Sequence, residues 1–209
     1  MKSALGAAIL LPLGSSSVAS GCTPDPVAAV TFAVPADSPQ SFSTVGPFQL
    51  IERSGATVTR EDLLGRPWAA SFLFTRCSGP CPRVRSTLKA LQGRLKDAEA
   101  RIVTFSVDPA WDRPEVLREY AQAVQADPRR WLFLTGEQDE IHGLIRQSFL
   151  SAVEQAPPGT APVGEQVSHR TQIVAVDKKG RVRGFYHGES EDQLDLLVER
   201  LAFLQRESE

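Results

Sequence analysis

The sequence predicts an α/β fold, in which a central mixed β-sheet is flanked by helices and accompanied by an N-terminal hairpin. Between residues 67 and 149, apolar segments of strand length alternate with segments of helical periodicity, which is typical of parallel strands joined by helices. Two later strand-like segments are joined through Asp177-Lys178-Lys179-Gly180, a hairpin signal that adds antiparallel pairing. Apolar residues make up 42% of the chain and the formal net charge is −2. These totals indicate a globular protein and argue against nucleic acid as a partner.

The expected elements follow the chain in a simple order. A hairpin with its turn at Ser54-Gly55 is expected over residues 48–59, followed by a helical turn over 59–64. Strands are expected at 67–75, 101–107, 131–134, 170–176 and 181–187, and helices at 84–98, 114–126, 137–149 and 194–204. Residues 151–168 contain Pro157-Pro158-Gly159, Pro162 and Gly164, and we expect an irregular loop there, which is functional or mobile in most domains.

The N-terminal region predicts export. Lys2 is followed by an apolar run from Ala4 to Leu13, which has the length of a signal-peptide core and is too short to span a bilayer. The small residues that precede Cys22 resemble a lipobox, which implies cleavage before Cys22 and acylation of its sulfur; Ala19 departs from the usual Leu. The alternative is an ordinary signal peptide that contains a cysteine. We expect a signal peptide at 1–21, a flexible tether at 22–45, one domain at 46–206 and a tail at 207–209.

Two cysteines lie where an apolar strand is expected to run into a helix, in Cys77-Ser78-Gly79-Pro80-Cys81-Pro82. Pro82 favours a helix that begins beside Cys81. The helix N-terminus and nearby arginines are expected to lower the pKa of both thiols. Thiolates bind soft metals or exchange disulfides. A structural disulfide is the alternative, and it would stabilise little because the loop it closes is so short.

His169 is the third candidate ligand, because it precedes a strand expected to lie beside the one that leads into the cysteines. Two thiolates and one imidazole form a soft set that suits Cu(I), and Cu(II) with a further weak ligand; zinc tolerates the same set. His142 and His187 are expected at surface or packing positions, and Trp68 and Trp131 in the core. Asp108 should lie near the cysteine edge as a turn residue, and Trp111 is expected in a loop there, either as a cover or as a partner contact.

These residues resemble the Sco/SenC family of copper chaperones. The matching pieces are Gly46-Pro47-Phe48, the segment from Phe74 through Pro82, Ser106-Val107-Asp108-Pro109 with Asp112 and Pro114, Leu134-Thr135-Gly136, and His169 before the final strands. The resemblance covers about residues 46 to 205 and implies a thioredoxin-like fold with Cys77, Cys81 and His169 as copper ligands. It further implies that the protein delivers copper to the Cu-A centre of cytochrome c oxidase or keeps the cysteines of that centre reduced. The lipobox-like segment before Cys22 implies a lipid anchor on the extracytoplasmic (periplasmic) side of a membrane.

A second function remains open, because Cys77 and Cys81 would also serve as the redox pair of a thiol–disulfide oxidoreductase that reduces cysteines of the oxidase or of another exported copper protein. Ordinary thioredoxin is disfavoured because no Trp-Cys-x-x-Cys is present, and a peroxidase because Thr75-Arg76-Cys77 lacks that family's spacing. Two positions depart from the pattern of the resembled family. Gly79 and Ser168 each stand where that family often has Asp, so we expect a more electropositive site.

Overall fold

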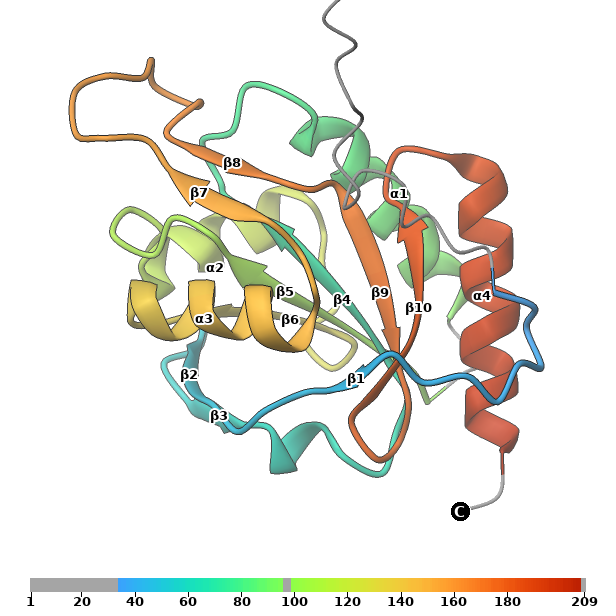
Figure 1. Cartoon of the computed structure of the whole chain (residues 1–209). Helices are drawn as coiled ribbons and strands as arrows, with labels where there is room; N and C mark the ends of the chain where they lie inside the picture. Colours follow the sequence, from blue (N-terminus) through green and yellow to red (C-terminus); the bar gives the residue numbers. More distant parts are fainter. Residues whose placement is uncertain (1–33, 96–98, 208–209) are drawn as a thin grey trace, which may run out of the picture. The chain divides into compact units, whose positions relative to one another are not determined.

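The computed structural model describes residues 34–95 and 99–207. Its main feature is a mixed sheet of eight strands, in the order β1-β10-β9-β4-β5-β6-β2-β3 (Figure 1). The strands are β1 (Ser43–Thr44), β2 (Gln49–Glu52), β3 (Thr57–Thr59), β4 (Trp68–Leu73), β5 (Arg101–Ser106), β6 (Trp131–Thr135), β9 (Gln172–Val176) and β10 (Arg181–His187). Strands β4, β5 and β6 run parallel, whereas β9 and β10 add antiparallel pairs. The predicted mixed sheet is confirmed.

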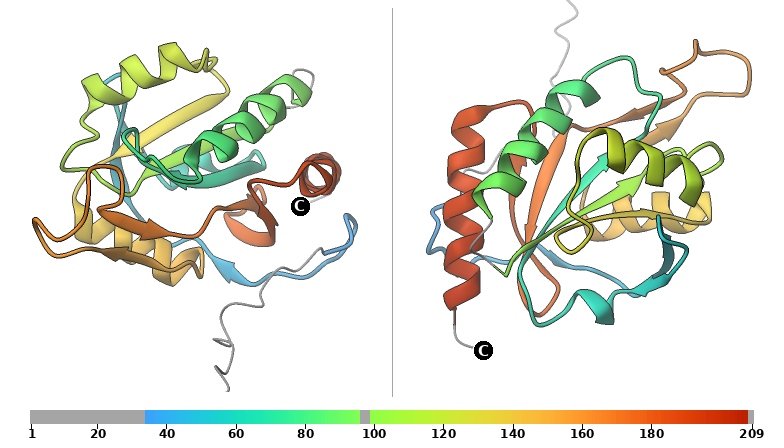
Figure 2. Two further views of the ribbon diagram at one scale, coloured as in Figure 1. Left: turned by 90° about the horizontal axis from the view of Figure 1, so that it is seen from above. Right: turned by 180° about the vertical axis from the view of Figure 1, so that it is seen from behind.

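Helices cover both faces of this sheet. Figure 2 shows α1 (Cys81–Arg94) and α2 (Pro114–Ala123) on one face and α3 (Gln138–Ser148) on the other. The last helix, α4 (Glu191–Arg206), packs against α1 and β10. A short 3-10 helix, η1 (Glu61–Leu63), follows the predicted β2–β3 hairpin, whose turn contains Gly55 at a φ of +92°. No helix in the described part of the chain is both long and apolar enough to cross a bilayer.

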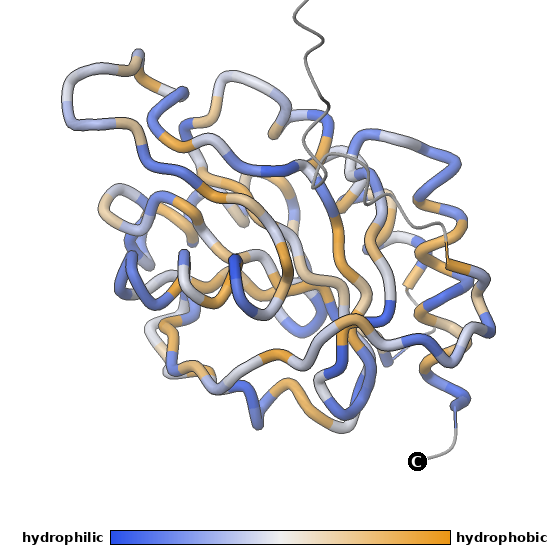
Figure 3. The backbone as a smooth tube through the Cα atoms, in the orientation of Figure 1, coloured by the Kyte–Doolittle hydropathy of each residue, from blue (hydrophilic) through white to orange (hydrophobic). Residues whose placement is uncertain are grey.

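The core lies on both faces of the central strands, where buried side chains of all four helices pack against the sheet. Figure 3 shows the hydrophobic residues concentrated along these strands. Phe105 contacts the rings of Trp68, Phe72 and Phe149, with centroids 5.4 to 6.3 Å apart, and edge-to-face or offset ring contacts of this kind add to the energy of burial. Trp68 and Trp131 are both fully buried, as predicted.

The region expected to be an irregular loop contains a second, two-stranded sheet, and in this respect the prediction is wrong. Strands β7 (Val153–Gln155) and β8 (Val167–His169) pair antiparallel, with Val153 opposite His169. The first residue of each strand is buried and faces the core, whereas the residues that follow are more exposed. This β7–β8 hairpin holds His169 at the end of a strand rather than in a free loop.

The segment before the predicted domain boundary at residue 46 is packed on the domain. Strand β1 pairs with the start of β10, and Val34 and Val45 are buried. Residues 34–45, which the sequence assigns to the tether, are therefore part of the described fold. The predicted signal peptide and most of the predicted tether lie outside the described residues.

Candidate metal centre

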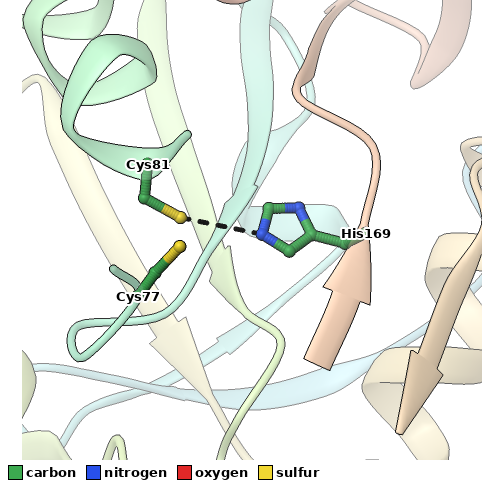
Figure 4. Close-up of side chains that lie close together, drawn as sticks. All are labelled: Cys77, Cys81 and His169. Carbon is green, nitrogen blue, oxygen red and sulfur yellow. Dashed lines mark hydrogen bonds between the residues drawn. The ribbon is translucent and has the colours of Figure 1, made fainter. Parts of the chain in front are cut away.

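Three elements bring Cys77, Cys81 and His169 together (Figure 4). Cys77 lies in the loop after β4, Cys81 is the first residue of α1, and His169 ends β8. The two sulfurs and a ring nitrogen of His169 all lie within 4.8 Å of one another, and Cys81 Sγ is 3.7 Å from His169 Nε2. The three candidate ligands predicted from sequence thus form one cluster, and both thiols are free.

The imidazole of His169 is oriented by its own chain. Its Nδ1 lies 3.0 Å from the carbonyl oxygen of Arg170. A carbonyl oxygen only accepts hydrogen bonds, so Nδ1 carries the proton and donates it. Nε2 therefore faces the sulfurs: its lone pair is available to a metal in the neutral ring, and in the doubly protonated ring its N–H donates to a thiolate. Phe74 packs edge-on against the ring, with centroids 6.0 Å apart, and limits its rotation.

The two thiols have opposite electrostatic environments. Burial alone would raise the pKa of Cys77, but hydrogen bonds from His169, from the Cys81 side chain and from backbone groups outweigh it and lower the pKa to about 7. Cys81 is 3% exposed, and burial followed by the interaction with Cys77 raises the pKa of its thiol. The expectation that both pKa values are lowered is therefore wrong for Cys81. Its desolvation outweighs the field of the helix N-terminus.

An open hollow of about 320 Å³ lies on the Cys77 side of the cluster. It is lined by the Cys77 loop and by the end of the β7–β8 hairpin, including Gly164, Glu165 and Ser168. The backbone N–H of Ser78 donates to the Gly164 carbonyl at 3.4 Å. Gly164 has a φ of +92°, and an added Cβ would lie 2.7 Å from the Arg76 carbonyl oxygen. The hairpin therefore contacts the Cys77 loop closely, and only glycine fits there without strain.

A turn after β5 supports the same loop. Asp112 is fully buried and accepts hydrogen bonds from the Thr75 hydroxyl at 2.5 Å and from the Ser106 hydroxyl at 2.6 Å. Burial raises the pKa of Asp112, against the effect of these hydrogen bonds. Asp108 lies near the cysteine edge, as predicted, where its carboxylate pairs with Arg76 at 2.8 Å. The sequence includes Asp112 in a motif but does not reveal its contacts with Thr75 and Ser106, and it gives no sign that Gly164 contacts the Cys77 loop.

The remaining predicted positions lie elsewhere. His142 is buried, and its Nε2 lies 2.9 Å from the Val107 carbonyl oxygen, so the predicted packing role is confirmed. His187 ends β10 on the surface. Cys22 lies outside the described residues.

The comparisons with known proteins agree with this geometry. A family model described as SCO1/SenC matches residues 36–202. The chain belongs to the SCO1/SenC family. The match begins before residue 46, consistent with the packing of β1 on the sheet.

Three solved structures illustrate the relationship. A SCO1/SenC family lipoprotein from Bacillus anthracis str. Ames matches with a TM-score of 0.71 and 30% identity, over 78% of this chain and 95% of that one. BsSco, a member of the Sco family of cytochrome c oxidase assembly proteins with a disulfide switch, matches with a TM-score of 0.70 and 31% identity, over 80% and 96%. Yeast Sco1 with copper bound matches with a TM-score of 0.64 and 26% identity, over 77% and 90%. The thioredoxin-like fold implied by the resemblance is confirmed.

Proposed function

We propose that this protein binds copper through Cys77, Cys81 and His169 and passes it on during assembly of the Cu-A centre of cytochrome c oxidase. The observation that carries the proposal is the convergence of two sulfurs and one imidazole nitrogen within 4.8 Å. This donor set suits Cu(I), and it suits Cu(II) when a further weak ligand is added. The copper-bound yeast relative and the oxidase-assembly relative support the same assignment.

The geometry also suits release of the metal. Cys77 and His169 are only partly buried and border the open hollow, so an incoming ligand has access from that side. Cys81 is buried beneath them. Copper would therefore leave by replacement of the two accessible ligands before the buried one.

Metal titration of the reduced protein tests the assignment. We expect the native protein to bind one copper ion with a sulfur-to-copper absorption band, and the variants Cys77→Ala, Cys81→Ala and His169→Ala to lose high-affinity binding. His187→Ala is the matched control, because this histidine lies on the surface at the end of β10, and it should bind as the native protein does. Native affinity in His169→Ala would contradict the three-ligand site.

Membrane attachment is the second part of the proposal. We infer that Cys22 is acylated and holds the domain on the extracytoplasmic (periplasmic) side of a membrane. The small residues before Cys22 and the Bacillus anthracis lipoprotein support this inference. Fractionation of cells that express Cys22→Ser should show the protein released from the membrane. A variant that remains in the membrane fraction and is labelled by palmitate would contradict it.

Thiol–disulfide exchange is a second candidate function, favoured by the asymmetry of the two thiols. Cys77, with a pKa of about 7, would attack a partner disulfide as thiolate and release one partner thiolate. Cys81 would then lose its proton and displace the other partner thiol, so that two electrons pass to the partner and a Cys77–Cys81 disulfide remains. His169→Ala separates the two functions. Copper binding should be lost, whereas disulfide reduction should persist and shift to higher pH.

A further inference from the structure

Cys77 and His169 belong to different parts of the fold, and a backbone contact joins those parts. His169 ends β8, which among the described residues pairs only with β7, whereas Cys77 follows the central strand β4. Gly164, in the same hairpin as His169, contacts the residues on both sides of Cys77. Its carbonyl oxygen accepts from the Ser78 N–H at 3.4 Å, and an added Cβ would lie 2.7 Å from the Arg76 carbonyl oxygen. The hairpin that carries one candidate ligand therefore braces the loop that carries another.

The residue that Gly164 approaches is itself held in place. Arg76 pairs with the buried Asp108 carboxylate at 2.8 Å. Trp111 covers the guanidinium of Arg76, whose Cζ lies 4.8 Å from the ring centroid. The Trp111 N–H donates to the Asp108 carbonyl oxygen at 3.1 Å, so both contacts come from one turn. Crowding between Gly164 and Arg76 would therefore move the hairpin more easily than the Cys77 loop.

The proposed copper site tolerates little movement of the hairpin. Its three donor atoms lie within 4.8 Å of one another, and a ligand set is effective only when it is held within about 0.5 Å of its productive arrangement. Ordinary van der Waals contact with a Cβ begins at 3.4 Å, so a side chain at residue 164 would push the two backbones apart by several tenths of an ångström. This displacement is comparable with the tolerance of the site.

We propose that Gly164 is a positioning residue for copper binding: it lets the β7–β8 hairpin approach the Cys77 loop closely enough for His169 and Cys77 to bind the same ion. Gly164 has no side chain, so it acts through the placement of the donor atoms. Replacement of residues that orient metal ligands typically costs about 10- to 100-fold in metal affinity. This inference rests on the proposed copper-binding function, because it names a residue that sets the affinity of that site.

Gly164→Ala and Gly159→Ala form a matched pair of variants. Both glycines lie in the segment that joins β7 to β8 and have positive φ, +92° and +77°, so both substitutions carry backbone strain. An added Cβ at residue 159, however, meets no atom within 4 Å. In Cu(I) titrations of the reduced protein against a chelator of known affinity, we expect Gly164→Ala to bind about 10- to 100-fold more weakly than the native protein. Gly159→Ala should bind as the native protein does. Native affinity in Gly164→Ala, or an equal loss in both variants, would overturn the proposal.

A double-mutant cycle with His169→Ala shows whether Gly164 acts through the third ligand. The two thiolates that remain in His169→Ala are soft ligands that still bind Cu(I), although more weakly. In this background we expect Gly164→Ala to cause no further loss of Cu(I) affinity. The same fold loss with and without His169 would reveal a general disturbance of the fold, and it would overturn the positioning role.

Gln166→Ala is a milder variant that decides the question if Gly164→Ala does not fold. The Gln166 side-chain oxygen accepts from the Gly164 N–H at 2.8 Å, and the loss of one such hydrogen bond changes an equilibrium constant by about two- to tenfold. We expect Cu(I) affinity to fall by a factor of this size, and native affinity would count against the proposal. If the native protein bound no copper, or if His169→Ala bound it with native affinity, the proposed function itself would fail instead.

Discussion

Cys77 and Cys81 are chemically identical side chains that the structure makes different. Cys77 accepts hydrogen bonds at the edge of a hollow, whereas Cys81 is buried under the first turn of α1. A sequence motif places both thiols at a helix N-terminus but cannot show how deeply each sulfur is buried below the surface. That depth decides which sulfur is a thiolate at neutral pH.

Cysteine alkylation as a function of pH should show this difference. We expect Cys77 in the metal-free, reduced protein to react with iodoacetamide with a midpoint near its pKa of about 7. Cys81 should react slowly throughout, because burial raises its pKa and restricts access. Mass spectrometry of the labelled peptides gives both rates. In denaturant both midpoints should move to about 8.5, and equal rates in the folded protein would contradict the assignment.

Gly79 allows the charge of the site to be tested without disturbing its packing. An added Cβ at this position meets no atom within 4 Å, and φ is not in the left-handed region. Gly79→Asp should therefore fold normally, place an anion near Cys77 and raise the pKa of that thiol. Slower alkylation of Cys77 at pH 7 is the expected result, with Gly79→Asn as the uncharged control. Equal rates for the two variants would show that the carboxylate has no electrostatic effect.

Among the secondary-structure elements, the sequence predicted the long strands and helices but not the β7–β8 hairpin. The apolar run from Trp68 to Leu73 is buried on both faces and is easily recognised as a central strand. Strands β7 and β8 have three residues each and are separated by eleven residues. Three residues are too few to show the alternation of apolar and polar side chains by which a strand is recognised in a sequence. His169 could be identified as a candidate ligand, but not the strand that positions it.

Asp112 tests how the turn before α2 supports the Cys77 loop. Asp112→Ala leaves the hydroxyl groups of partly buried Thr75 and buried Ser106 without their shared acceptor. We expect a loss of about 1–3 kcal/mol in the free energy of unfolding, measured by urea denaturation, together with weaker copper binding. Asp139→Ala, on the exposed first turn of α3, is the control. Native copper affinity in Asp112→Ala would show that the loop keeps its shape without this contact.

In the whole molecule, two buried arginines connect the N-terminal segment to the C-terminal end of the chain. Arg183 donates to the carbonyl oxygens of Ser38 and Gln40 and pairs with Asp177 and Glu207. Arg200 donates to the Ala36 carbonyl at 2.6 Å. The predicted domain boundary at residue 46 missed this segment because it is almost uncharged and is bound mainly through its backbone. Sequence patterns depend on the type of side chain at each position, so they do not reveal hydrogen bonds to backbone carbonyl oxygens.

Acid unfolding should depend on this network through Asp177. Burial acts to raise the pKa of Asp177, but hydrogen bonds and charges from Arg181 and Arg183 outweigh it and lower the pKa. The unfolded chain takes up the proton near the ordinary pKa of about 3.9, whereas the folded protein keeps the carboxylate charged to lower pH. The stabilisation is therefore complete above pH 5 or so and is lost progressively as the pH falls through both pKa values.

Asp177→Asn should remove part of this acid dependence. At pH 7 we expect a loss of about 3 kcal/mol in the free energy of unfolding, because buried Arg183 loses a charged partner. Between about pH 5 and 2, stability should fall less steeply than in the native protein. Glu207→Gln should also lower the free energy of unfolding at pH 7 and flatten its fall with pH. Both effects should be smaller than in Asp177→Asn, since Glu207 is more exposed than Asp177. Parallel native and Asp177→Asn curves of stability against pH would show that this carboxylate does not link the arginines to folding.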